Sequence, residues 1–72
     1  MNIWNESNYF MLVISMTAEK CQKSIYETYH YLSQYKGIKF LQEFYDVEHT
    51  LNTDDVVDDV LAISERNGGG GV

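Results

Sequence analysis

Apolar residues recur every three or four positions along most of this chain, which is the spacing of one face of an α-helix. The first such segment runs from Ser7 to Lys23. One side of it carries Phe10, Val13, Ile14, Thr17 and Cys21. Residues 9–14 are also rich enough in aromatic and branched side chains to form a buried strand, so both helix and strand stay open for this segment.

A second helix is predicted to begin after Ser24, because Ser24 and Glu27 have the spacing of a capping box. Its expected buried stripe is formed by Ile25, Tyr29 and Leu32. Lys36 and Gly37 supply a cationic last turn and a C-cap. No basic residue lies between the tyrosines of this segment (Tyr26, Tyr29, Tyr31 and Tyr35), so we interpret them as packing residues rather than a surface that stacks on bases.

Two more helices complete the pattern. The third is predicted from Ile38 to about His49, with an apolar face of Phe40, Leu41, Phe44, Val47 and Leu51. The fourth begins with Thr53 as N-cap and ends near Asn67, with its aspartates Asp55, Asp58 and Asp59 facing water and a buried side of Val56, Val57, Val60, Leu61 and Ile63. The predicted fold class is therefore all-α, a compact bundle of three to four short helices.

Residues 1–67 are predicted to form a single helical domain, and residues 68–72 a disordered glycine-rich tail that does not pack. With 72 residues there is little room for a deep substrate cavity. Cys21 is the only cysteine, which excludes an intramolecular disulfide. The apolar run at residues 9–14 has no basic residue before it and is far shorter than a membrane span of roughly 20 residues, so we expect a cytoplasmic protein without membrane contact.

Negative charge is concentrated in the second half of the chain. Residues 1–40 hold four lysines and three glutamates, whereas residues 41–72 hold eight acidic residues and Arg66 alone, which gives the net charge of −6. No basic face is visible that would bind nucleic-acid phosphates directly. The acidic half favours a basic protein partner, or solubility alone. The candidate contact residues are Asp54, Asp55, Asp58 and Asp59, with Tyr45 and His49 as an aromatic–polar anchor.

The segment FYDVEHT, residues 44–50, carries the candidate chemistry of the chain. Asp46 and His49 are three residues apart and share a face on a helix. As a catalytic pair, the aspartate would orient the imidazole as a general base, but the sequence offers neither nucleophile nor oxyanion site. As metal ligands they would need His30 or Cys21 as a third partner.

We favour a structural interpretation of FYDVEHT. Asp46 and His49 are expected to hydrogen-bond each other or nearby backbone, and Thr50 to satisfy a free carbonyl where the helix ends. On this interpretation Tyr45, Asp46, His49 and Thr50 form a structural motif. We therefore expect no catalytic residue, metal or cofactor.

These residues resemble a family of small bacterial proteins, domain of unknown function 3791. The family pattern is aromatic-Tyr-Asp-x-Leu-His-Thr, after a helix that ends in glycine and before a short acidic–apolar helix, which here is Val56–Asp59. The run Phe10–Val13 is similar to the family's apolar first helix, so the resemblance covers about residues 9–63. Two departures stand out. Glu48 occupies the place of the leucine, which would put an acid on an apolar contact, and a glycine common before Ser24 is missing.

The resemblance implies no established activity. It implies an accessory protein encoded beside a larger partner of an ADP-ribosyltransferase-like type, and hence an antitoxin-like or regulatory role. We therefore hypothesise a small acidic protein–protein interaction module, which occludes a basic site of its partner. The alternatives are a small enzyme or metal-binding protein that uses Asp46 and His49, and a phage-type inhibitor whose aspartates mimic nucleic-acid charge.

Overall fold

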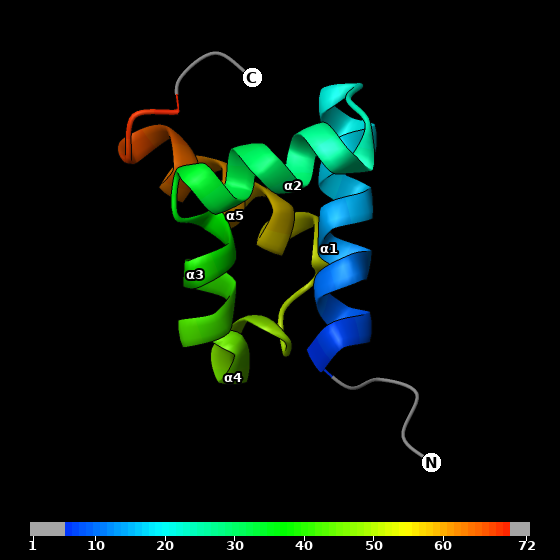
Figure 1. The fold of residues 1–72 in the computed structure, drawn as a ribbon. Helices are drawn as coiled ribbons and strands as arrows, with labels where there is room; N and C mark the ends of the chain where they lie inside the picture. The colour runs from blue at the N-terminus through cyan, green and yellow to red at the C-terminus, as the bar shows by residue number, and fades with distance from the viewer. Residues whose placement is uncertain (1–5, 70–72) are drawn as a thin grey trace.

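Five α-helices make up the fold in this computed structural model, which describes residues 6–69, with side chains from Asn8 onward. They are α1 (Glu6–Cys21), α2 (Ile25–Gln34), α3 (Gly37–Glu43), α4 (Tyr45–Glu48) and α5 (Thr53–Arg66) (Figure 1). The all-α class is confirmed, and the first segment is a helix rather than a strand. The predicted third helix is divided into α3 and α4, so there is one more helix than expected.

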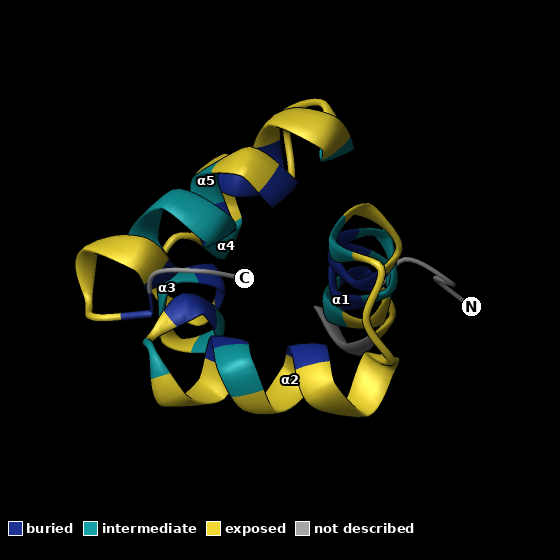
Figure 2. Ribbon diagram, turned by 90° about the horizontal axis from the view of Figure 1, so that it is seen from above, coloured by how far each residue is buried: buried dark blue, intermediate teal, exposed yellow. Residues whose placement is uncertain are grey.

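The helices enclose one core. α1 and α3 stand on opposite sides, α2 crosses between them, and α5 passes behind α2 (Figure 1). Seen from above, the buried faces of α1, α2 and α5 turn toward this shared interior (Figure 2). The central side chains are Tyr9, Val13, Ile14, Leu32, Leu41, Val56 and Val60. Within residues 6–69, no helix has the length and apolar content that crossing a lipid bilayer requires.

Helix α1 buries the face that its spacing predicts. Val13, Ile14 and Thr17 are all buried, and the hydroxyl of Thr17 donates to the carbonyl of Val13 at 2.7 Å. This bond allows a polar side chain to lie in the core at no cost of an unpaired hydroxyl. The helix ends where Gln22 adopts a positive φ of 55°.

Helix α2 confirms its predicted start but not its predicted face. The backbone N–H of Glu27 donates to the Ser24 hydroxyl at 3.0 Å, and the Glu27 carboxylate reaches back to the Ser24 N–H, as a capping box requires. Leu32 is buried, but Ile25 and Tyr29 are about half exposed. The inward position of the first turn belongs to Thr28, whose hydroxyl is satisfied by the Ser24 carbonyl at 2.9 Å.

Gly37 is not the C-cap of α2 that the sequence indicated. Lys36 takes the left-handed conformation, with φ 69°, and Gly37 begins α3 as a buried residue. A Cβ atom at this position would lie 2.7 Å from Oγ of Ser64 and 3.0 Å from Cδ2 of Leu32. Gly37 is therefore needed for the close approach of α3 to α5, not for a positive φ.

The beginning of the glycine segment packs against α2. Gly69 is buried, its N–H donates to the Ser64 carbonyl at 3.0 Å, and its carbonyl accepts a hydrogen bond from the Tyr31 hydroxyl. The prediction that this segment packs against nothing is therefore wrong at Gly69. The ring of Tyr35 lies so close that only a residue without Cβ fits there. Residues 70–72 of the predicted tail lie outside the described residues.

Replacing Gly37 with alanine is expected to destabilise the protein by about 1–3 kcal/mol, because the new Cβ overpacks the contact with Ser64. The measurement is urea unfolding followed by circular dichroism. Ser64→Ala is the matched partner, since it removes an Oγ that is buried without a hydrogen-bond partner among the described residues. Gly37→Ala should cost less in that background, and an equal cost in both backgrounds would rule out this contact as the cause.

Candidate functional site

The segment Phe44–Thr50 does not continue α3. Phe44 leaves helical geometry with φ −112° and ψ 21°, and the single turn of α4 begins at Tyr45. This turn lies at the end of α3, near the N-terminal end of α1 (Figure 1). The continuous helix predicted to run from Ile38 to His49 is therefore wrong at Phe44.

The break changes which side chains face water. Phe44, Val47 and Leu51 were predicted to extend the buried face of α3, but 48%, 60% and 43% of their surfaces are exposed. Together these three residues are named the α4 surface. The prediction failed because a helical stripe continues only while the helix does, and here the helix restarts in a new direction.

Tyr45 and His49 hold the turn together from opposite ends. Their rings stack at 4.7 Å between centroids with 9° between planes, and Nδ1 of His49 lies 2.6 Å from the Tyr45 carbonyl oxygen. The half-buried ring of Tyr45 also packs edge-on against Tyr9 of α1, at 5.3 Å between centroids. Thr50 makes the predicted contact, since its hydroxyl donates to the Val47 carbonyl at 2.7 Å.

Asp46 is exposed and does not join this arrangement. Across residues 8–69, no hydrogen bond or ion pair links it to His49. The expected lock is therefore formed by His49 and Tyr45, because α4 ends at Glu48 and the imidazole folds back over the tyrosine ring. The structure does not bring together the aspartate and imidazole that a general base of this type would use.

The other candidate metal ligands are also dispersed. Cys21 ends α1, and His30 is exposed on α2, where its ring contacts Tyr26 at 4.4 Å. Among the described side chains, no three His, Cys, Asp or Glu residues gather as a metal-ligand group.

The strongest electrostatic feature of the segment is Glu48, which sequence reasoning noted only as a departure from a family pattern. Only 5% of its surface is exposed, and its Oε2 has no hydrogen-bond partner in the described part of the chain. Asp59 of α5 lies beside it, and Tyr9 of α1 brings a buried hydroxyl that also lacks a described partner. These three residues are named the Glu48 cluster.

The pKa of Glu48 is raised from its ordinary value of 4.5 to about 7, first by burial and then by a hydrogen bond of the protonated carboxyl with Asp59 and by the negative charge of Asp59. Burial also raises the pKa of Tyr9, with smaller contributions from the charges of Glu48 and Tyr45. The cluster therefore holds a carboxyl group that takes up or releases a proton near neutral pH.

The four candidate aspartates of α5 occupy three different environments. Asp54 and Asp55 are exposed in the first turn, after Asn52, whose side chain caps the helix at the position expected for Thr53. Asp58 forms an ion pair with Lys20 of α1. This pair links α5 to α1 at the surface. Asp59 was predicted to face water but is half-buried, because it lies next to the inward residues of α5 and meets Glu48.

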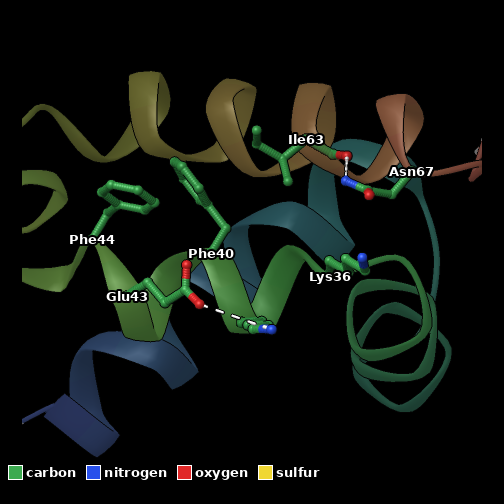
Figure 3. A pocket seen from close by; sticks show the side chains of 7 residues that line it. Lys36, Phe40, Glu43, Phe44, Ile63 and Asn67 are labelled. Atoms are coloured by element: carbon green, nitrogen blue, oxygen red, sulfur yellow. Dashed lines mark hydrogen bonds and ion pairs between the residues drawn. The ribbon is translucent and has the colours of Figure 1, made fainter.

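An open groove of about 190 Å³ separates α3 from the last turns of α5. Phe40 of α3 and Phe44, which follows α3, point toward α5 on the side of Ile63, whereas Asn67 of the same groove lies near Lys36 (Figure 3). The rim carries Lys36, Lys39 and Glu43, of which Lys39 and Glu43 form a weak ion pair at 3.9 Å. Phe44 connects this groove to the α4 surface. A second groove, of about 390 Å³, lies between α1 and α5 and is lined by Met16, Glu19, Lys20, Asp54 and Val57.

The family model described as "Protein of unknown function (DUF3791)" matches residues 8–65 of the chain. No curated protein and no solved structure matches it.

The raised pKa of Glu48 predicts that stability falls as the pH rises. The fold prefers the protonated carboxyl, so the stabilisation is complete below pH 4.5 and is lost as the pH rises to and past about 7. The total change is about 3 kcal/mol, since one pKa unit corresponds to about 1.4 kcal/mol. Urea unfolding between pH 4 and pH 8.5 measures it.

Glu48→Gln should flatten this part of the profile and stabilise the protein at pH 8. Glu43→Gln is the matched control, since Glu43 is exposed on α3 and its replacement should leave the profile as in the wild type. The assignment fails if Glu48→Gln keeps the full wild-type pH dependence.

Proposed function

The chain belongs to the DUF3791 family of proteins of unknown function, and we propose that it is a small protein–protein interaction module that neutralises or modulates a partner encoded nearby. The observation that carries the proposal is the exposure of Phe44, Val47 and Leu51. These large apolar side chains lie within eight consecutive residues and face water rather than the core. Exposed apolar surface of this kind is typical of protein contact sites.

The surroundings of the α4 surface fit an interface with a basic partner. His49 is exposed and supported by its stack on Tyr45, which supplies an ordered polar group next to the apolar residues. Asp54 and Asp55 follow a few residues later and supply negative charge at the start of α5. An apolar centre with a charged rim is the usual anatomy of such an interface, and the charges would steer a basic partner.

Asp58 and Asp59 contribute less to this contact than the sequence suggested. Asp58 already pairs with Lys20, and Asp59 belongs to the Glu48 cluster. The proposed contact therefore consists of the α4 surface, His49, Asp54 and Asp55. Tyr45 acts beneath it as a support. Dividing the four aspartates in this way also weakens the alternative of a nucleic-acid mimic, which needs a continuous row of exposed acids.

In an antitoxin-like role, the module would cover a basic site of an ADP-ribosyltransferase-like partner in the cytoplasm. The mechanism would be steric and electrostatic occlusion, without chemistry by the module itself. A chain of 72 residues is large enough to present one such face.

Val47→Ser and Leu51→Ser should each weaken binding of the neighbouring gene product about tenfold or more, because each removes an exposed apolar contact from the centre of the interface. Their effect on folding should stay within about 0.5 kcal/mol, since both side chains face water. Calorimetric titration measures the affinity. Ile25→Ser is the control, because Ile25 is comparably exposed (47%) on α2, at the far end of the molecule from α4 (Figure 1). Wild-type affinity in both α4 variants would contradict the proposal.

The double variant Asp54→Asn with Asp55→Asn should slow association with the same partner and flatten its dependence on ionic strength, because long-range steering by exposed charges is screened by salt. Stopped-flow association rates between about 20 and 300 mM salt measure this. Glu19→Gln with Glu43→Gln removes the same charge from exposed positions on α1 and α3. Equal loss of rate in both double variants would mean that net charge, not this face, guides binding.

A further inference from the structure

Helix α4 is a single turn and cannot hold its conformation alone. Two contacts hold it against α1 and α5, one through Tyr45 and one through Glu48. This position is called the seat of α4, and the form in which both contacts are made is called the seated form. On one side, Tyr45 packs against the rings of Tyr9 and Phe10 of α1, at 5.3 Å and 6.1 Å between centroids. On the other side, Glu48 is buried, with 5% of its surface exposed and its Oε2 without a described hydrogen-bond partner, and Asp59 of α5 lies beside it. The position of α4 therefore depends on an aromatic contact and on a pair of acids.

The acid contact is satisfied only while one carboxyl carries a proton. The titratable groups that lie beside Glu48 are Asp59 from α5 and Tyr9 from α1. Neither is a cation, and Lys20 of α1 pairs with Asp58 of α5 instead. When Glu48 ionises, its carboxylate is buried beside a second carboxylate. Neither neighbouring group offsets the loss of hydration or the repulsion between the two charges.

We infer that ionisation of Glu48 releases α4 from its seat on α1 and α5, so that a proton controls the presentation of the α4 surface. When α4 leaves this position, the carboxylate of Glu48 is hydrated again. The packing of Tyr45 against Tyr9 and Phe10 is then lost. The residues of the α4 surface, Phe44, Val47 and Leu51, flank Glu48 in the chain and move with it. The seated form, present at lower pH, is the one that binds the partner. This inference rests on the proposed function for its biological consequence, but the release itself is a property of the free chain.

The size of the effect follows from proton linkage. With a Glu48 pKa of about 7 in the seated form and 4.5 in water, the equilibrium constant for release rises about tenfold between pH 6 and pH 8. Opening that is confined to α4 costs less free energy than unfolding of the whole chain, so amides of α4 should be less protected than the core of α5 at each pH.

Amide hydrogen exchange of the free chain tests the release. The reporters are the N–H groups of Glu48, His49 and Leu51, which bond to carbonyls within this segment at 2.8–3.0 Å. The reference is Val60 in the buried face of α5. After correction for intrinsic exchange, protection of the reporters should drop about tenfold from pH 6 to pH 8 in the wild type and stay constant in Glu48→Gln. Protection of Val60 falls with the stability of the whole chain but should stay above that of the reporters at each pH.

Two more variants separate Glu48 from other groups. His30→Gln replaces an exposed histidine of α2, outside α4 and the proposed contact, and should retain the drop. Glu43→Gln removes an exposed carboxylate and should also retain it. An equal drop in wild type and Glu48→Gln, or reporters that are as well protected as Val60 at both pH values, would overturn the inference.

Binding then tests the consequence. The affinity of the wild type for the neighbouring gene product should fall by up to about tenfold from pH 6 to pH 8, while Glu48→Gln should bind equally at both. A pH response of the reporters without one in binding would overturn control of the surface. Loss of the proposed function is recognised separately, because Val47→Ser and Leu51→Ser would then bind like the wild type even though the reporters still respond to pH.

Discussion

The break in helical geometry at Phe44 decides which side chains of the following turn face water and which are buried. An uninterrupted helix would have carried the apolar stripe of Phe40 and Leu41 onward into the core. The chain instead restarts at Tyr45 as a single turn, with φ −112° and ψ 21° at the break. Val47 of this turn faces water, as do Phe44 before it and Leu51 after it, whereas Glu48 is buried. The exposed contact surface and the buried acid are two consequences of one change of direction.

Because Glu48 is buried, the protein is less stable in neutral solution than at low pH. A 72-residue chain has a small core and a narrow margin of stability. An apolar side chain of similar size would fill the same space without a dependence on pH. With Glu48, the contact of α4 with α5 is weakest at the pH values at which the carboxyl is ionised. The apolar residues of the proposed interface lie on either side of Glu48 in the chain. Local opening is thereby concentrated at the candidate site rather than spread over the fold.

Helix α5 is the element that the other contacts converge on. Its last turns approach α3 through Ser64 and Gly37, and the chain beyond it is fastened to α2 through Gly69 and Tyr31. The small residues Gly37, Ser64 and Gly69 let backbones approach closely, which a short chain needs in order to bury a core. With its C-terminal end fixed in this way, α5 presents its acidic first turn to water and Asp59 to α4.

The sequence by itself determined what depends on residues within one helical turn of one another. The all-α class, the capping box at Ser24 and the hydroxyl bond of Thr50 are of this kind, because helical periodicity and short-range hydrogen bonds act locally. Only the tertiary structure decided which stripe of α2 faces inward, why Gly37 is needed and that Glu48 is buried. A period of 3.6 residues allows neighbouring stripes almost equally well, and packing against the other helices selects between them.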